Sequence, residues 1–364
     1  MEILVMKLFA DIYRGKRVLI TGHTGFKGSW LALWLNEMGA VVTGIALPPE
    51  THPNHWELLA LATNEHRLDI LDFDAVKKAF SATKPDIVFH LAAQPLVRRS
   101  YRDPLETWST NVMGTANVLE ACRQTPSVRA IVAVTTDKCY ENREWPWGYR
   151  ENDRLGGHDP YSASKAGSEL VAASYRNSFF NIENAPLLAT ARAGNVIGGG
   201  DWSEDRLIPD LVRAVAQGQS LEIRSPRATR PWQHVLESLS GYLLLGQRLL
   251  QGDKTYAEAW NFGPEPEGNR SVSEVLGKLN AHWSNLCWHV TEKPQPHEAA
   301  LLYLDSAKAR SKLHWQPAWN FDAALEKTAA WYRAWLEGGK VTSREQLVEY
   351  ITAATRANLE SAAQ

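Results

Sequence analysis

The sequence has few cysteines, and they are not arranged to form a structural framework. Cys122, Cys139 and Cys287 are widely spaced, their number is odd, and no two of them form a Cys-x-x-Cys pair. Disulfide-stapled folds and structural zinc sites need closely spaced cysteines. The cysteine pattern therefore argues against both, predicts no metal site, and favours a reducing compartment such as the cytoplasm.

Two further deficits narrow the range of partners. No run of apolar residues is long enough to cross a bilayer, so we expect no membrane-spanning segment. The 39 basic and 41 acidic side chains leave a net charge of only −2. Such a chain has no broad field that would attract nucleic acid or an anionic membrane, so an anionic ligand must be held by local groups.

In its first half the chain alternates short apolar runs with helical patterns. Strands are predicted over residues 16–21, 41–46, 86–91 and 130–135, with a further strand ending at Asp69–Ile70. Helices are predicted over residues 30–38, 74–80, 111–123 and 161–179. Strict alternation of this kind is typical of an α/β fold with a doubly wound parallel (Rossmann) sheet.

The second half is less regular and predicts a smaller α/β domain. We assign residues 12–190 to the doubly wound domain, with segments near 230–263 returning to it; Trp260–Gly263 reads as one such strand. Residues 191–340 belong mainly to the second domain, and 341–364 to a C-terminal helix or tail.

A glycine-rich turn follows the first strand. Gly22 permits the tight turn, Gly25 lets the backbone approach a pyrophosphate, and Gly28 lets the helix pack closely on the strand. Free amides at the start of the helix would hold the phosphate. The predicted dinucleotide-binding residues of this turn are Gly22, His23, Thr24, Gly25, Phe26, Lys27 and Gly28. Lys27 either adds charge there or is a solvated surface residue.

One feature of dinucleotide sites is missing. An acidic residue usually ends the second strand and binds the adenosine ribose. Here that place reads Ala46-Leu47-Pro48-Pro49, no acid occurs before Glu50, and no arginine is evident for a 2′-phosphate. NAD is the expected cofactor, with NADP still open. Asp69 is either a partner for the adenine amine or a helix cap.

Tyr161 and Lys165 open the long helix and form a Tyr-x-x-x-Lys pattern. Residues four apart share a helix face, so the phenol and the ammonium are predicted to reach one site. The cation would favour the phenolate and let Tyr161 act as a base, while Lys165 could also bind the nicotinamide ribose.

Polar residues also follow the fifth strand, where Thr135-Thr136-Asp137-Lys138 meets the expected ligand crevice. Thr136 could share a proton with the substrate hydroxyl. Asp137 and Lys138 are either a second acid/base pair or a surface salt bridge beyond the sheet.

Together these residues resemble the extended short-chain dehydrogenase/reductase family over roughly residues 15–335. The resemblance includes His90-Leu91-Ala92-Ala93-Gln94 and Arg192 to Gly198, and within the family it is strongest to the nucleotide-sugar 4,6-dehydratases. Most of these carry Thr-Asp-Glu where this chain has Thr136-Asp137-Lys138. That difference, the turn at 21–28 and the segment 230–235 are similar to the branch that acts on CDP-glucose.

The resemblance implies conversion of CDP-D-glucose to CDP-4-keto-6-deoxy-D-glucose and water. It assigns the catalytic roles to Thr136, Asp137, Lys138, Tyr161 and Lys165. Asp137 would protonate the leaving 6-hydroxyl group. Lys138 would either remove the C5 proton, if its neutral form is favoured, or stay cationic and stabilise the enolate.

The resemblance also implies the binding residues. For NAD they are the glycine turn together with Asp69, Ile70, Leu91, Ala92, Ala93, Gln94, Thr135, Tyr161 and Lys165. For the nucleotide hexose they are Asn195, Arg206 and Arg230, with His297-Glu298 as a weaker candidate. Relatives are usually homodimers built from paired helices, so a homodimer or homotetramer is expected.

Three other functions stay open at this level. A GDP-mannose or dTDP-glucose dehydratase and a 4-epimerase would use the same fold, and the residues alone do not identify the base of the nucleotide. A non-catalytic dinucleotide sensor is a more distant alternative, because such a protein has no use for Thr136, Tyr161 and Lys165 together.

Overall fold

Apolar strands of the first half assemble into a parallel sheet in the computed structural model, which describes residues 9–283, 286–292 and 299–362. The order across the sheet is β11-β6-β5-β4-β1-β2-β3, and each neighbouring pair is parallel. The strands are β1 (Arg17–Thr21), β2 (Val41–Ala46), β3 (Asn64–Arg67), β4 (Ile87–His90), β5 (Ala130–Val134), β6 (Leu187–Ala193) and β11 (Ala259–Phe262). The expected doubly wound parallel sheet is confirmed.

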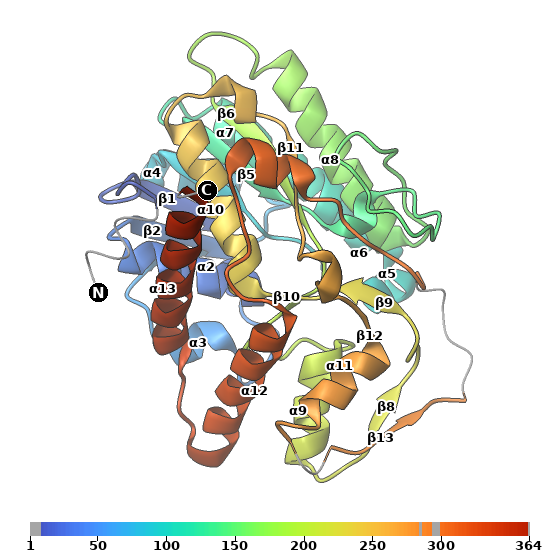
Figure 1. Cartoon of the computed structure of the whole chain (residues 1–364). Helices are drawn as coiled ribbons and strands as arrows, with labels where there is room; N and C mark the ends of the chain where they lie inside the picture. Colours follow the sequence, from blue (N-terminus) through green and yellow to red (C-terminus); the bar gives the residue numbers. More distant parts are fainter. Residues whose placement is uncertain (1–8, 284–285, 293–298, 363–364) are drawn as a thin grey trace.

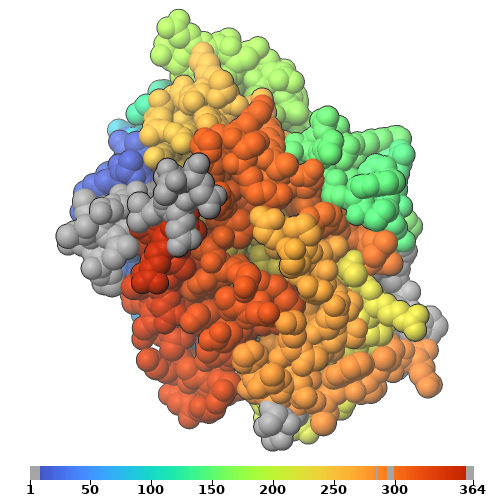
Figure 2. All heavy atoms as spheres, in the orientation of Figure 1, coloured from blue at the N-terminus to red at the C-terminus, as the bar shows by residue number. Residues whose placement is uncertain are grey.

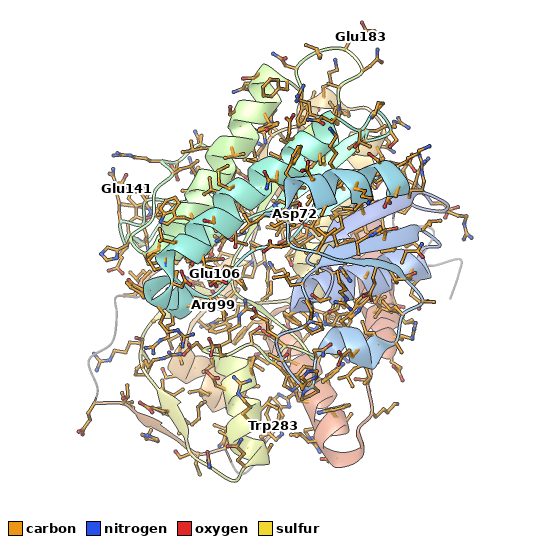
Figure 3. The ribbon with its side chains drawn as sticks, turned by 180° about the vertical axis from the view of Figure 1, so that it is seen from behind. Asp72, Arg99, Glu106, Glu141, Glu183 and Trp283 are labelled. Atoms are coloured by element: carbon orange, nitrogen blue, oxygen red, sulfur yellow. The ribbon has the colours of Figure 1, made fainter. Side chains whose placement is uncertain are left out.

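Helices cover both faces of this sheet (Figure 1). On the face seen in Figure 1 lie α2 (Phe26–Glu37), α10 (Val235–Leu250) and α13 (Ser343–Ala362). The view from behind in Figure 3 shows the other face, covered by α4 (Phe73–Thr83), α7 (Gly114–Arg123) and α8 (Pro160–Ser178). Alternate residues of one strand serve the two layers: Val18 and Ile20 join the core under α2 and α10, whereas Leu19 joins the core under α4 and α7.

The remaining elements are further helices, short helical turns and a smaller unit of paired strands. The further helices are α3 (His55–Leu59), α5 (Val97–Arg102), α6 (Pro104–Trp108), α9 (Leu207–Ala216), α11 (Val272–Leu279) and α12 (Phe321–Gly338). Short helical turns occur at Ser109–Met113, Asp137–Cys139, Lys254–Tyr256, Pro266–Gly268 and Ala309–Leu313. The further strands are β7 (Val196–Ile197), β8 (Leu221–Ile223), β9 (Thr229–Pro231), β10 (Gln233–His234), β12 (Asn269–Ser271) and β13 (Trp288–Val290).

The irregular second half forms small two-stranded pairs rather than a second large sheet. β8 pairs with β13, β9 with β12, and β10 with β7. α9, α11, β8, β9, β12 and β13 gather on one side of the molecule, beyond the ends of the sheet strands (Figure 1). Residues of the later part of the chain, coloured yellow to red, cover most of the face drawn in Figure 2.

The structure corrects one strand boundary. The expected third strand was to end at Asp69–Ile70, but β3 ends at Arg67. Asp69 instead closes a turn, because its Oδ1 accepts from Leu71 N at 2.9 Å and its carbonyl accepts from Asp72 N at 3.1 Å. The strand expected at Trp260–Gly263 is present as β11 and pairs with β6. The proposed division into two domains stays a prediction.

Candidate active site

Several strands of the sheet open at their carboxyl ends onto one cavity of about 1330 Å³. A pocket for a single small ligand usually has roughly 300–1,000 Å³. This volume leaves space for two ligands side by side. Of the residues predicted to act in the site, those that line the cavity are Gly22, Thr24, Gly25, Phe26, Lys27, Gly28, Asp69, Ile70, Leu91, Ala92, Ala93, Gln94, Thr135, Thr136, Asp137, Lys138, Tyr161, Lys165, Asn195, Arg206 and Arg230.

The glycine turn has the shape that a dinucleotide requires. A Cβ on Gly22 would stand 2.7 Å from Ala92 N, and one on Gly28 would stand 2.1 Å from Gly22 O. Gly22 also has a φ of +78°, which favours glycine. Gly25 caps α2 without any side-chain hydrogen bond, so the first amides of this helix stay available to a phosphate. The turn therefore fits a pyrophosphate.

His23 is the exception among the predicted residues, because its side chain does not line the cavity. The ring is fully buried behind the turn, 4.6 Å from the ring of Trp56 and 3.8 Å from a Glu65 oxygen. It packs against Gly44, where an added Cβ would lie 2.3 Å from the ring. The His23 ring thus packs on β2 instead of facing the cavity, and the sequence pattern could not show this because it depends on a contact with the next strand.

Two other predicted residues face the cavity in part only. Gln94 is buried, and its amide bonds Leu96 and the hydroxyl of Thr107. Thr135 donates to Glu169 Oε1 at 2.5 Å. The side chains of Gln94 and Thr135 thus support the wall. Their backbone amides are also bonded within the protein, Gln94 N to Asn111 Oδ1 and Thr135 N to Ala191 O, both at 2.9 Å. For Asp69, the helix-cap alternative is wrong, because the cap of α4 is Asp72.

The polar residues after β5 converge as expected. Thr136 donates to Asp137 Oδ1 at 2.9 Å, and Lys138 Nζ lies 4.0 Å from the same oxygen. Asp137 is only 1% exposed, and its Oδ2 has no hydrogen-bond partner among the described residues. The surface salt bridge considered from the sequence is therefore excluded. A buried carboxylate oxygen without a partner, on the wall of a cavity, is suited to contact a ligand.

Tyr161 and Lys165 are both buried on the same wall, at the start of α8. Burial raises the pKa of Tyr161 to about 12, although a hydrogen bond with Thr136 and the charge of Arg206 act to lower it. Burial lowers the pKa of Lys165 to about 8, against the charge of Glu169. Lys165 Nζ lies 3.4 Å from Val134 O. The phenolate expected from the sequence is therefore not favoured in the protein alone, because burial outweighs the nearby cations.

Lys27 is not the solvated surface residue considered from the sequence. Its Nζ donates to the hydroxyl of Tyr242 in α10 at 3.1 Å. Burial and the charge of Arg206 lower the pKa of Lys27 to about 7, while Asp137 acts to raise it. Lys27 therefore belongs to the same electrostatic cluster as the residues after β5.

The predicted nucleotide-sugar residues lie on the part of the wall formed after β6. Arg206 forms an ion pair with Asp201 at 3.1 Å, and its charge reaches both Tyr161 and Lys27. Arg230, in β9, is buried, and its NH1 donates to Thr229 O at 2.8 Å. Asn195 stands between β6 and β7. His297-Glu298 lies outside the described residues.

A buried network beneath these groups was missed in the sequence. Glu169 accepts two hydrogen bonds from Arg192, both at 2.9 Å, and further ones from Thr135 and Thr190. Arg192 also donates to the hydroxyl of Tyr140 at 2.7 Å. The network ties α8 to β6 and to the chain after β5. The sequence pattern could have indicated this network, because Glu169 continues the four-residue spacing of Tyr161 and Lys165. Arg192 also interrupts an otherwise apolar strand.

Neither metal ligands nor a membrane helix are found within residues 9–283, 286–292 and 299–362. No group of three or more His, Cys, Asp or Glu side chains in these ranges could hold a metal ion. No helix in these ranges is long and apolar enough to cross a membrane. Cys122, Cys139 and Cys287 are all free thiols.

Comparison with known proteins shows that the chain is similar to nucleotide-sugar dehydratases and epimerases. The model of the family described as GDP-mannose 4,6 dehydratase matches residues 19–328. The CDP-glucose 4,6-dehydratase of Salmonella typhimurium is 48% identical over 355 residues, which cover 95% of this chain and 99% of that one. A probable dTDP-glucose 4,6-dehydratase of Sinorhizobium fredii is 27% identical, with 89% and 93% covered.

Solved structures share the fold. An epimerase from Methanothermobacter thermautotrophicus superposes with a TM-score of 0.81 at 27% identity, covering 92% of this chain and 96% of that one. The UDP-glucose 4-epimerase of Thermus thermophilus in complex with NAD gives a TM-score of 0.76 at 24% identity, with 87% and 98% covered.

Proposed function

The chain belongs to the GDP-mannose 4,6 dehydratase family, and on that premise we propose that it is an NAD-dependent CDP-glucose 4,6-dehydratase. The product would be CDP-4-keto-6-deoxy-D-glucose, formed with loss of water. The observation that carries this proposal is the convergence of Thr136, Asp137, Lys138, Tyr161 and Lys165 on the cavity that also contains the glycine turn. The 48% identity to a CDP-glucose 4,6-dehydratase supports the choice of nucleotide.

The cofactor is proposed to lie along the glycine turn, whose close approach to Ala92 and free amides suit a pyrophosphate. Ile70 and Leu91–Ala93 line the neighbouring wall of the cavity. When bound, NAD⁺ would supply a hydride acceptor for C4 of the hexose and return the hydride to C6. Lys165, one turn along α8 from Tyr161, is proposed to bind the nicotinamide ribose.

Tyr161 is proposed to take the proton of the 4-hydroxyl group, with Thr136 sharing a hydrogen bond to the phenol. The high pKa of Tyr161 means that positive charge must approach before the proton can leave. Arg206 already acts in that direction. The cationic ring of an oxidised nicotinamide would add to it.

Asp137 and Lys138 are proposed to carry out the loss of water. The C4 ketone makes the C5 proton acidic, and that proton must leave while the 6-hydroxyl group departs as water. Asp137 presents a buried carboxyl oxygen without a partner, which suits proton donation to the leaving hydroxyl. Lys138 stands 4.0 Å from this carboxylate. It either accepts the C5 proton or stays cationic and stabilises the enolate while another group accepts that proton.

The diphosphate of the nucleotide hexose is proposed to bind Arg206 and Arg230, because guanidinium groups suit phosphate oxygens. Asn195 would contact the sugar. All three residues line the cavity on the side of the smaller unit. The free cysteines support a reducing compartment, and we propose a cytoplasmic location on that ground.

A homodimer or homotetramer is proposed to form through the helices behind the sheet. Large apolar side chains are exposed on α5, α6, the turn after α6, and α8, namely Tyr101, Leu105, Trp108, Met113 and Leu170. α6 and α8 pack against each other. A cluster of exposed apolar side chains on adjacent helices supports a protein–protein interface there.

The test is incubation with CDP-glucose, GDP-mannose, dTDP-glucose and UDP-glucose, read by mass spectrometry. We expect loss of one water from CDP-glucose and no comparable turnover of the others. A product of unchanged mass would identify an epimerase instead. Turnover of another nucleotide hexose in preference to CDP-glucose would overturn the choice of base.

The proposed base has its own test in Tyr161→Phe. The variant should bind the dinucleotide normally and lose about 10²–10⁴-fold in turnover, which is the usual range for removal of a general acid or base. Normal turnover by this variant would refute the assignment.

The proposed acid/base pair is tested with Asp137→Asn and Lys138→Met. Each should slow water loss more than oxidation at C4, so reduced nicotinamide should accumulate in a single turnover. Its near-ultraviolet absorbance gives the readout. Failure to form reduced nicotinamide at all would contradict these roles.

A further inference from the structure

The loop after β2 lines the cavity but lacks the acidic residue that usually ends this strand. The loop is tied to the glycine turn, because the hydroxyl of Thr24 donates to Leu47 O at 3.1 Å. Glu50, three residues beyond Leu47, lines the same cavity. The structure thus brings a carboxylate to the end of the site next to the turn, although the local sequence pattern does not predict one there.

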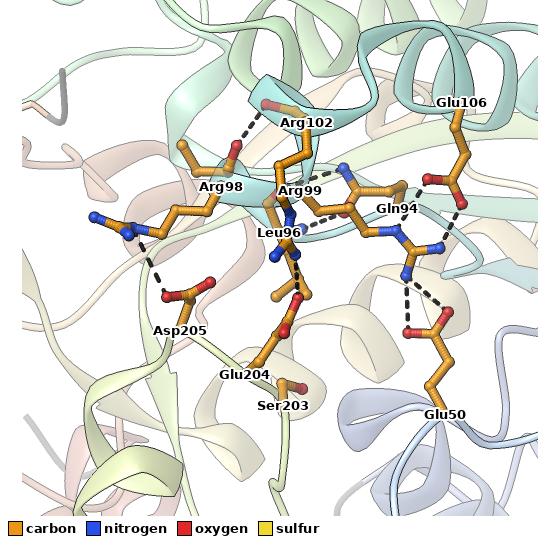
Figure 4. A network of polar contacts seen from close by, with 12 residues as sticks. Glu50, Gln94, Leu96, Arg98, Arg99, Arg102, Glu106, Ser203, Glu204 and Asp205 are labelled. Atoms are coloured by element: carbon orange, nitrogen blue, oxygen red, sulfur yellow. Dashed lines mark hydrogen bonds and ion pairs between the residues drawn. The ribbon is translucent and has the colours of Figure 1, made fainter. Parts of the chain in front are cut away.

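Glu50 is held in place by a guanidinium from another element. Arg99, in α5, donates through NH1 to both Glu50 oxygens, at 2.8 and 3.0 Å (Figure 4). The same arginine donates to both oxygens of Glu106 in α6, at 2.9 and 2.5 Å. Figure 3 shows Arg99 and Glu106 beside each other from behind. The two-nitrogen fork on Glu106 fixes the orientation of the Arg99 guanidinium. The remaining terminal nitrogen holds both oxygens of Glu50, so Glu50 is positioned although it is 63% exposed.

The charge balance at this place is negative. Two carboxylates, Glu50 and Glu106, share the single positive charge of Arg99. The other guanidinium beside the loop, Arg67, bonds Leu47 O at 3.3 Å and is paired with Glu65 at 2.5 Å. A phosphate monoester, with a charge of about −1.5 to −2, would have to displace one of these carboxylates. A ribose hydroxyl could donate to Glu50 without displacing anything.

We propose that Glu50, positioned by Arg99, is the residue that selects NAD over NADP. The Glu50 carboxylate accepts a hydrogen bond from the 2′-hydroxyl of the adenosine ribose and repels a 2′-phosphate. Arg99 orients the carboxylate and neutralises part of its charge. The inference rests on the proposed function only in requiring a bound dinucleotide.

The test measures binding of NADH and NADPH to the full chain without any nucleotide sugar, by nicotinamide fluorescence. The wild-type protein should bind NADH at least about tenfold more tightly than NADPH, as expected for one charge-assisted hydrogen bond. Glu50→Gln should lower that ratio by about tenfold or more, because the repulsion is lost and Arg99 gains a free donor. Arg99→Gln should weaken NADH binding without admitting NADPH.

Glu204→Gln is the matched control. Glu204 is paired at 2.5 Å with Arg102 on the same helix as Arg99 (Figure 4), and its exposed fraction of 54% is close to the 63% of Glu50. It should leave the NADH-to-NADPH ratio unchanged. Equal binding of the two dinucleotides by the wild type, an unchanged ratio in Glu50→Gln, or an equal change in Glu204→Gln would overturn the proposal. Because no sugar is present, these outcomes are independent of whether CDP-glucose is the substrate.

Discussion

Two regions of the molecule each bury a carboxylate, but only one of them supplies a counter-ion for it. Under the active site, Glu169 faces Arg192 and two threonine hydroxyls. Under the C-terminal helices, Glu237 at the start of α10 accepts from the amides of Ala318 and Trp319 and from the hydroxyl of Tyr350. One carboxylate has a counter-ion, whereas the other has only dipoles.

The two pKa values follow from this difference. Burial acts to raise the pKa of Glu169, but the charge and hydrogen bonds of Arg192 outweigh it, so the pKa is lowered. Burial raises the pKa of Glu237 to about 7, and the amides and Tyr350 oppose it only in part. A full charge is thus kept beneath the proposed catalytic residues, where it acts on Lys165. The anchor of the C-terminal helices titrates near neutrality.

The largest expected effect comes from breaking the ion pair. Arg192→Met would leave the Glu169 carboxylate buried without a counter-ion, and we expect a loss of about 3–5 kcal/mol in unfolding free energy. Urea denaturation measures it. The double variant Arg192→Met with Glu169→Gln should recover part of this loss, because no unpaired charge remains. Additive losses would mean that the pair is not coupled.

The second prediction uses pH to separate the regions. The raised pKa of Glu237 means that its stabilising contribution is fully present below about pH 4.5 and is lost as pH rises through about 7, a change of about 3 kcal/mol. The lowered pKa of Glu169 has the opposite sign, because its contribution is present above about pH 4.5 and is lost on acidification. In thermal unfolding from pH 4 to 8, Glu237→Gln should lack the loss of stability that the wild type shows as pH rises from about 4.5 through about 7. A decline equal to that of the wild type would refute the assignment.

A third prediction compares one hydrogen bond in each region. Tyr350→Phe removes a 2.7 Å hydrogen bond from Glu237 and should cost about 1.5–3 kcal/mol. Thr190→Val removes a 2.7 Å hydrogen bond from Glu169 but leaves Arg192 in place, so we expect about 1 kcal/mol. Chemical denaturation of both variants at neutral pH gives the comparison. A larger loss of unfolding free energy for Thr190→Val than for Tyr350→Phe would contradict this prediction.

The smallest expected effect is a shift of the pH–rate profile. Glu169 raises the pKa of Lys165, so Glu169→Gln should lower that pKa from about 8. If the ammonium binds the cofactor ribose, the alkaline limb of turnover should move to lower pH by up to about one unit. A loss of activity without any shift would indicate a merely structural role for Glu169.

Local sequence was enough for the features that depend on neighbouring residues. The glycine turn, the alternation of strands and helices, and the spacing of Tyr161 and Lys165 are all short-range patterns, and apart from the end of β3 each lies where it was expected. The strand at Trp260–Gly263 was also found from its residues alone. Backbone sterics, side-chain period and helix geometry determine such features within a few residues.

Long-range contacts decided the rest. His23 belongs to the turn by sequence, but Gly44 and Trp56 turn its ring away from the cavity. The high pKa of Tyr161 depends on burial, which Tyr-x-x-x-Lys spacing does not encode. Glu50 is held by a hydrogen bond from Arg99, which lies 49 residues further along the chain.

The amino-acid sequence by itself determined the doubly wound sheet, the glycine turn and the spacing of the proposed reactive side chains, because these depend on local spacing and on which faces are apolar. Only the tertiary structure decided which charges are paired, which are buried, and which face the cavity. Electrostatic energy depends on distance and solvent access, and both are set by how distant segments pack.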